Sequence, residues 1–387
     1  MIGKPALRAW LLLGAAMTAM GCSGLENLSK CRSVDPDTRI AGCTALIQSG
    51  QLTTGNLSTS YNNRGTAYSS KGDHDRAIQD FNEAIRLNPN FERAYYDRGN
   101  AYIDKEEYDR AIQDFNEAIQ LNPNAETAYY GRGYACKKKG DYDRAIQDFN
   151  EAVRLNPNFE RAYYDRGNAY IDKEEYDRAI QDFNEAIQLN PNNANNYNNR
   201  GVAYNRKGDY GRAIQDFSQA IHLSSNDTTA YLNRGGAYFA QSNLTAAIAD
   251  FEHTISAAPS SNAAVSAAML LHVVMKRQGH DDAQQLARVA AAADLSKWPG
   301  PVLKLDLGQV TANEVMVATA SGVSAWQKWR VCGANYFTGE DALLHHQRTT
   351  ALARFTAARD ACPKGDMGYT AALAELKRLG ASAAPAK

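Results

Sequence analysis

The chain has 387 residues, of which 44% are hydrophobic, and a formal net charge of −1. The apolar content allows a sizeable core, in two ordinary domains or one extended array. The near-neutral charge excludes the usual electrostatic case for a nucleic-acid partner, and it gives no case for an acidic or anionic-lipid partner either.

Residues 1–21 are expected to be a signal peptide. Lys4 and Arg8 precede an apolar run, Ala9 to Met20, that is shorter than the roughly 20 residues of a membrane span. The small residues before Cys22 resemble the lipobox of bacterial lipoproteins, in which the cysteine is lipidated. We therefore expect an exported chain anchored to a membrane through Cys22. The alternative is ordinary signal cleavage near Gly21, with Cys22 incidental.

Residues 22–57 form an N-terminal segment ahead of a repeated region. Asp35-Pro36-Asp37 opens a short helix, which should run through Ile47 and stop near Gly50.

An internal repeat follows. The tripeptide Asn-Pro-Asn recurs every 34 residues, beginning at Asn88, Asn122, Asn156 and Asn190. The dipeptide Arg-Gly recurs in step with it, beginning at Arg64, Arg98, Arg132, Arg166, Arg200 and Arg234. A fixed period of this length indicates a repeat array. We assign six units: 58–91, 92–125, 126–159, 160–193, 194–227 and 228–261.

Two stretches of this array are nearly identical. Residues 72–124 and 140–192 differ only at His74/Tyr142 and Ile85/Val153. A block of two repeats has therefore been copied, and the same surface should be presented twice.

Each unit predicts two antiparallel helices. In the second repeat, 92–125, small residues such as Gly99 and Ala111 allow the two helices to approach closely, and Phe115 fills the gap between them. Pro123 ends the second helix, since proline can neither donate a hydrogen bond nor continue a helix. Arg98 is expected to pack its aliphatic stem while its head reaches water.

The pattern Tyr-x-x-Arg-Gly-x-Ala-Tyr, then Gly-Asp-Tyr-Asp-Arg-Ala-Ile-x-Asp-Phe and Ala-Ile-x-Leu-Asn-Pro, resembles the tetratricopeptide repeat. The resemblance implies an all-α fold, a right-handed superhelix of antiparallel helix pairs, in which each repeat buries its apolar face against its neighbours.

The pattern decays after Ser261. We expect a degenerate helix pair over 262–298, a linker with helices over 299–331, a divergent repeat-like unit over 332–365, and a capping helix and tail over 366–387. Thr311-x-x-Glu314 is a capping-box signature for a helix start. The segments Leu-Ser-Lys-Trp-Pro-Gly-Pro and Ala-Arg-Asp-Ala-Cys-Pro-Lys-Gly resemble the ends of Gram-negative envelope repeat lipoproteins of the new-lipoprotein-I type.

The six cysteines fit an oxidising compartment. Besides Cys22, we expect a disulfide between Cys332 and Cys362 and a second between Cys31 and Cys43. Cys136 takes a position that tyrosine fills in other units, and is interpreted as a buried, inert thiol.

Known catalytic motifs are absent from the sequence, so we predict no enzyme, cofactor or metal site. The pair His345-His346 could suggest a metal ligand, but an exposed polar pair is the simpler interpretation.

The resemblance places partner binding on the concave face, which the first helix of each repeat lines. Carried over by position, the residues expected to line this groove are Tyr96, Asn100, Ile103, Tyr130, Tyr134, Lys137, Tyr164, Asn168, Ile171 and Asn198. Aromatic anchors give large contact areas, and asparagine amides can pair with a peptide backbone. The alternative is that these tyrosines only pack between repeats.

The function predicted from these features is a non-catalytic scaffold or adaptor of a Gram-negative envelope, periplasmic or anchored in the outer membrane, that binds a protein or peptide. The alternatives are a chaperone-type or assembly-factor receptor and a repeat subunit of an envelope enzyme complex. A receptor that grips a C-terminal carboxylate needs lysine where Tyr96 stands, which disfavours that version.

Overall fold

The computed structural model describes residues 22–280, 282–319, 327–362 and 367–381, so the expected signal peptide lies outside the described residues. Within these ranges the chain forms 21 helices, α2 to α22, and no strand. It divides into two compact units, Met1–Ala162 and Tyr163–Lys387. The prediction of an all-α fold is confirmed.

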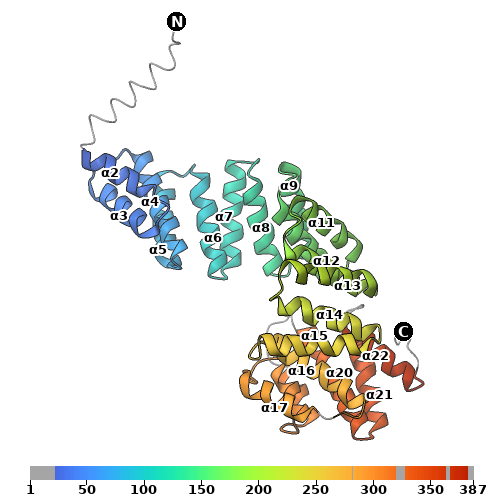
Figure 1. The fold of residues 1–387 in the computed structure, drawn as a ribbon. Coiled ribbons are helices and arrows are strands. Elements are labelled where there is room, and N and C mark those ends of the chain that lie inside the picture. Colours follow the sequence, from blue (N-terminus) through green and yellow to red (C-terminus); the bar gives the residue numbers. More distant parts are fainter. Residues whose placement is uncertain (1–21, 281, 320–326, 363–366, 382–387) are drawn as a thin grey trace. The chain divides into compact units, whose positions relative to one another are not determined.

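The first unit consists of successive antiparallel helix pairs (Figure 1). Its helices are α2 (Cys22–Cys31), α3 (Pro36–Gln48), α4 (Thr54–Ser70), α5 (His74–Leu87), α6 (Glu92–Asp104), α7 (Tyr108–Leu121), α8 (Glu126–Lys138) and α9 (Tyr142–Leu155). The Asp35 side chain caps α3 by accepting a hydrogen bond from the Thr38 backbone N–H at 2.8 Å, as expected for a helix that opens at Asp35-Pro36.

The second unit continues the pairs and ends in a more compact group of helices. The continuing pairs are α10 (Glu160–Asp172, which begins in the first unit), α11 (Tyr176–Leu189), α12 (Ala194–Lys207), α13 (Tyr210–Leu223), α14 (Thr228–Ala240) and α15 (Leu244–Ala257). The terminal helices are α16 (Asn262–Arg277), α17 (Ala283–Ala292), α18 (Gly300–Asp306), α19 (Ala312–Thr319), α20 (Gln327–Leu344), α21 (Arg348–Ala361) and α22 (Met367–Arg378).

The turn inside each repeat requires a residue with a left-handed backbone. Gly72, Gly140 and Gly208 supply it with φ of 78°, 82° and 82°. Glu106 and Glu174 occupy the same position with φ of 60° and 62°. This conformation costs a non-glycine residue about 1–2 kcal/mol. Tertiary packing therefore keeps the turn where the favourable glycine is missing.

One phenylalanine per repeat forms the core of each helix pair. Phe81, Phe115, Phe149 and Phe183 are each 0% exposed. A methyl group added to Gly99 would lie 2.9 Å from the Phe115 ring. The glycine of the first helix thus makes room for the phenylalanine of the second, as the sequence predicts.

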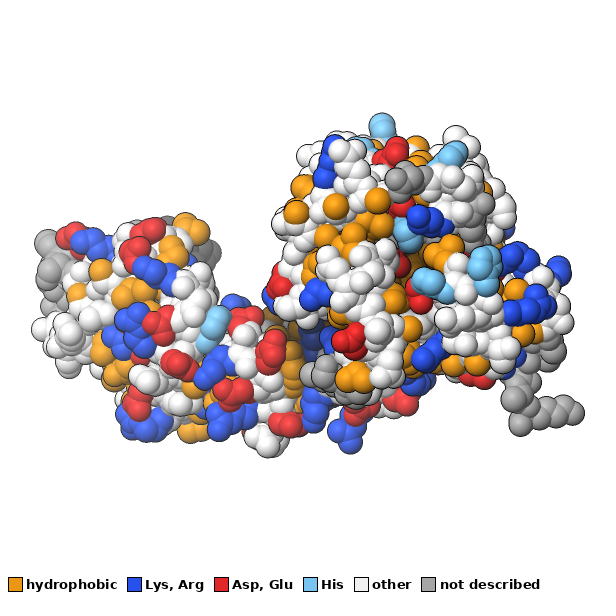
Figure 2. All heavy atoms as spheres, turned by 90° about the horizontal axis from the view of Figure 1, so that it is seen from below, with side chains coloured by type: hydrophobic (Ala, Val, Ile, Leu, Met, Phe, Trp, Pro, Cys, Tyr) orange, Lys and Arg blue, Asp and Glu red, His pale blue; other side chains and the backbone are white. Residues whose placement is uncertain are grey.

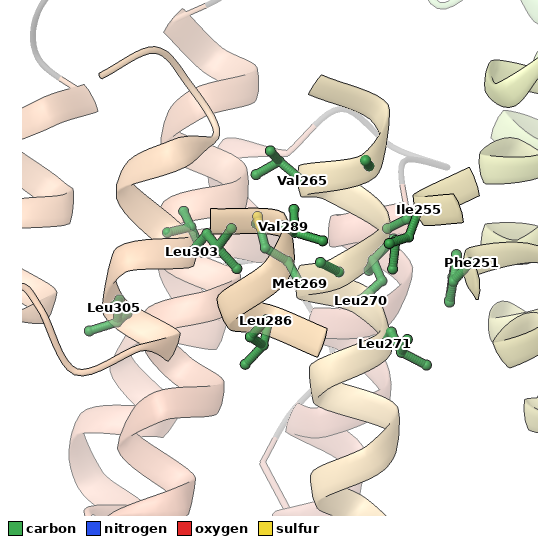
Figure 3. Packing of buried hydrophobic residues seen from close by; sticks show 14 of the residues in the cluster. Phe251, Ile255, Val265, Met269, Leu270, Leu271, Leu286, Val289, Leu303 and Leu305 are labelled. Atoms are coloured by element: carbon green, nitrogen blue, oxygen red, sulfur yellow. The ribbon is translucent and has the colours of Figure 1, made fainter. Parts of the chain in front are cut away.

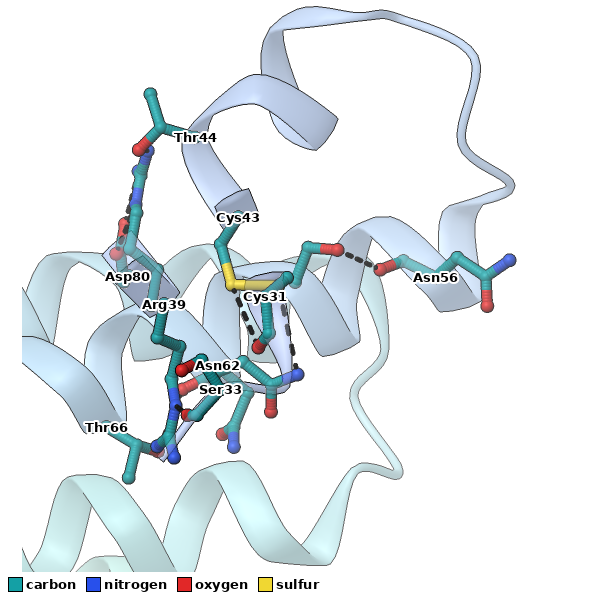
Figure 4. Close-up of a disulfide and its surroundings, with 12 residues drawn as sticks. Cys31, Ser33, Arg39, Cys43, Thr44, Asn56, Asn62, Thr66 and Asp80 are labelled. Carbon is teal, nitrogen blue, oxygen red and sulfur yellow. Dashed lines mark hydrogen bonds and ion pairs between the residues drawn. A yellow bond between two sulfur atoms is a disulfide. The ribbon is translucent and has the colours of Figure 1, made fainter. Parts of the chain in front are cut away.

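Both expected cysteine pairs are joined as disulfides. Cys31 and Cys43 connect α2 to α3 (Figure 4), and Cys332 and Cys362 connect α20 to the residue that follows α21. The second bridge spans 30 residues of sequence. In the chain-entropy account, a crosslink that closes a loop of this length stabilises the fold by about 3–4 kcal/mol.

The largest apolar cluster of the second unit joins the last repeat to the terminal helices. Phe251 of α15 and Leu270 of α16 belong to this cluster together with Leu286 and Val289 of α17 and Leu303 of α18 (Figure 3). At the start of α19, the Thr311 backbone N–H donates to Glu314 at 2.7 Å, and the Glu314 N–H donates to the Thr311 hydroxyl at 3.3 Å. The predicted capping box is confirmed.

Candidate functional site

The arginine of each Arg-Gly pair forms an ion pair inside its own repeat. In the second repeat, Arg98 of α6 donates through Nε and Nη2 to both carboxylate oxygens of Asp114 on α7, at 2.8 and 2.6 Å. The Arg98 side chain is 19% exposed, and that of Asp114 is 6% exposed. The same bidentate pair occurs in all six repeats: Arg64–Asp80, Arg98–Asp114, Arg132–Asp148, Arg166–Asp182, Arg200–Asp216 and Arg234–Asp250.

Each of these arginines also contacts other residues. Arg98 lies over the ring of Tyr95, with 5.6 Å between the guanidinium carbon and the ring centroid. It also donates to the side-chain oxygen of Asn82 in the preceding repeat at 2.6 Å. The sequence-based expectation for Arg98 missed its partner: the guanidinium binds the buried carboxylate of Asp114 in the same helix pair, and the side chain stays partly exposed. The arginine row is structural.

In the first unit, the predicted tyrosines lie partly exposed on the first helices. Tyr96 packs against Phe115 with 5.9 Å between ring centroids, and Tyr130 packs against Phe149 at 5.8 Å and Phe159 at 5.1 Å. One side of each ring therefore belongs to the core, and the remainder is available at the surface.

Neighbouring positions on α6 and α8 are also half-buried. Ile103 packs against the cluster of Phe115, and the Lys137 ammonium group lies 5.4 Å from the ring centroid of Tyr134. Neither Asn100 nor the Tyr96 hydroxyl makes a hydrogen bond to the described residues. Figure 2 shows basic and acidic side chains intermingled on the face it presents.

In the second unit, a hydrogen-bond network occupies the corresponding polar groups. Asn199 of α12 donates to the Tyr164 hydroxyl at 3.0 Å and to the Asn168 side-chain oxygen at 2.8 Å, both on α10. Asn198 accepts from Asn233 of α14 at 3.1 Å. Ile171 is half-buried. These residues connect successive repeats, so packing between repeats is part of their role.

Other residues singled out from the sequence fit a structural interpretation. Cys136 is buried, and burial raises the pKa of its thiol to about 11, so it is unreactive at neutral pH. His345 is exposed and contacts Asp341. In the described part of the chain, three or more His, Cys, Asp or Glu side chains nowhere form a group able to hold a metal. Cys22 begins α2, but its side chain lies outside the described set.

None of the described helices has both the length and the apolar character that crossing a bilayer requires.

Two known structures that align with TM-scores above 0.5 support the fold. A tetratricopeptide repeat protein from Parabacteroides merdae aligns with a TM-score of 0.53 and 19% identity, over 66% of this chain and 99% of its own. PilW, described as a type IV pilus biogenesis factor, aligns with a TM-score of 0.51 and 16% identity, over 54% and 97%. MamA from Desulfovibrio magneticus is 26% identical over 45% of this chain and 99% of its own, with a TM-score of 0.43.

Comparison with curated proteins gives no significant match. Models of the tetratricopeptide repeat match residues 58–91, 96–160 and 228–261, and a further model described as a TPR repeat matches 167–208 and 203–242. All of these models describe the repeat, and none describes an enzyme. The chain therefore carries tetratricopeptide repeats and belongs to the tetratricopeptide-repeat proteins.

Proposed function

We propose that this chain is a non-catalytic scaffold of the bacterial cell envelope that binds a polypeptide segment on the first helices of its repeats. The observation that carries the proposal is the open pair of polar groups on α6, the hydroxyl of Tyr96 and the amide of Asn100. Neither has a hydrogen-bond partner among the described residues.

The duplicated sequence shows why this pair is open. Tyr164 and Asn168 are the copies of Tyr96 and Asn100, and both are bonded to Asn199. The position equivalent to Asn199 in the first unit is Gly131, which has no side chain to offer. The same two residues are thus satisfied in one copy and open in the other.

The open pair suits a peptide backbone. The amide of Asn100 can donate to a carbonyl and accept from an N–H, and the Tyr96 hydroxyl can do either. Half-buried Ile103, three residues beyond Asn100 on α6 and in the same apolar cluster as Tyr96, offers apolar contact to the side chains of the same segment. Such an arrangement combines aromatic anchors with backbone recognition.

To test this, peptides would be selected from a displayed random library against the purified chain, and their affinities measured by titration calorimetry. The double substitution Tyr96→Phe/Asn100→Ala removes the open polar groups but keeps the ring on Phe115. We expect it to weaken binding by about 1–2 kcal/mol, roughly 5–30-fold in Kd.

The matched control is Tyr164→Phe/Asn168→Ala, the same change in the copy that is internally bonded. This control should lower the melting temperature, because it breaks the link to Asn199, and leave peptide affinity unchanged. Equal affinity for the wild type and the Tyr96→Phe/Asn100→Ala variant would disprove the proposal.

We also propose that the chain is exported and anchored through a lipidated Cys22. Three features support export: the positively charged residues near the N-terminus, the short apolar run that follows them, and the paired cysteines. The wild type should fractionate with envelope membranes and incorporate labelled fatty acid, and Cys22→Ser should abolish the label. Recovery of the wild type from the cytosol with residues 1–21 intact would contradict export.

A further inference from the structure

A cavity of about 550 Å³ lies within the second unit. The ends of α16 and α18, the start of α17 and the C-terminal half of α20 enclose it. Its acidic lining residues come from three different segments: Asp282, Asp306, Glu340 and Asp341. Its apolar lining includes Leu286, Leu305 and Phe337. The volume is typical of small-ligand sites.

One carboxylate in this lining has an unmet hydrogen bond. Oδ2 of Asp306 is buried and has no hydrogen-bond partner. Burial raises the pKa of this carboxyl to about 7, against the opposing charge of His272. A buried acceptor without a donor is costly, so a ligand that brings an N–H group would relieve that cost.

The basic groups at the cavity do not fill this need. Nδ1 of His272 lies 2.9 and 3.0 Å from the two carboxylate oxygens of Asp282. His345 is exposed and contacts Asp341, with 3.3 Å between Nδ1 and Oδ1. Lys276 is exposed at the rim. None of these three basic groups donates a hydrogen bond to Oδ2 of Asp306.

We propose that this cavity binds a primary ammonium group carried on an alkyl stem. The ammonium group supplies the N–H donor that Asp306 lacks and the positive charge that the surrounding carboxylates favour. The stem contacts Leu286, Leu305 and Phe337. The same chemistry is found in a free aliphatic diamine and in a lysine side chain of a bound polypeptide. This cavity belongs to the second unit, whereas the surface proposed above to bind a peptide is on α6 of the first.

Calorimetry on the full chain would use two probes at equal ionic strength: 1,5-diaminopentane and an N-acetylated, C-amidated peptide with one lysine. We expect the wild type to bind at least one of them, and Asp306→Asn to weaken that binding by about tenfold or more. Binding of the diamine alone identifies a free amine as the ligand, and binding of the peptide alone identifies a polypeptide lysine.

The melting temperature distinguishes lost binding from lost folding. Because the pKa of the Asp306 carboxyl rises from 3.8 to about 7 on folding, its ionisation costs stability as the pH rises from about 4 to about 7, and the full cost is present above pH 7. Asp306→Asn should therefore keep or raise the melting temperature at and above pH 7. Glu117→Gln, an exposed change on α7, is the control and should leave amine binding unaltered. Failure of the wild type to bind either probe, or equal binding by Asp306→Asn, would overturn the proposal.

Discussion

Replacing Asp114 with alanine is expected to lower the free energy of unfolding by about 3 kcal/mol, because it removes one partner of a buried ion pair. The substitution leaves Arg98, whose side chain is 19% exposed, without the carboxylate that its guanidinium binds through two hydrogen bonds. Urea unfolding followed by circular dichroism measures the loss. Hydrogen exchange should localise it to α6 and α7, because each repeat contacts only its neighbours.

The ion pair itself contributes less than its removal costs. Burial raises the pKa of Asp114 despite the opposing effect of Arg98, so desolvation offsets much of the attraction. The double substitution Arg98→Leu/Asp114→Leu should therefore recover most of the stability that Asp114→Ala loses. Asp182→Ala is the matched replicate in the second unit, where Arg166 and Asp182 form the same pair. Wild-type stability in both alanine variants would mean that the arginines are solvated, as the sequence first suggested.

The partner of each arginine could have been predicted from the sequence. The aspartate follows the arginine by 16 residues in every repeat, so the spacing was present in the sequence. The periodicity of a single helix does not reveal this pair, because Arg98 lies on α6 and Asp114 on α7. A search for complementary charges across the predicted helix pair would have found the partner.

The fold was more readily predicted than the site. The pairing of helices within a repeat is determined locally, by the repeat period, the small residues and the phenylalanine of the second helix. These features are all visible in the sequence, so they predict tetratricopeptide repeats. The state of Asn100 depends instead on residue 131, which lies in the next repeat. Two nearly identical segments therefore differ in hydrogen bonding because of a residue outside the copied block.

The cavity around Asp306 could not be predicted from sequence. Its lining residues extend from His272 to His345 and show no spacing that marks them as neighbours. They meet because α16, α18 and α20 pack together without a repeat register. Only tertiary packing reveals that a carboxylate at the end of α18 is left without a donor.

Replacing Phe115 with alanine is expected to cost about 3–5 kcal/mol, the range for truncating a fully buried aromatic side chain. Phe115 is 0% exposed, and its ring lies against Gly99 of its own repeat and Gly131 of the next. The substitution therefore opens a cavity among α6, α7 and α8, and should loosen two repeats at once. Urea unfolding measures the loss, and hydrogen exchange should show it in both repeats.

A second substitution tests whether the cavity is the cause. A methyl group added to Gly131 would lie 2.6 Å from the Phe115 ring, so it occupies space that the alanine variant leaves empty. Gly131→Ala should consequently destabilise the wild type, in which the ring must shift, but should partly rescue Phe115→Ala. Helix propensity adds about 1 kcal/mol to that rescue. Identical effects of Gly131→Ala in the two backgrounds would show that the Phe115 ring does not fill the space between α6 and α8.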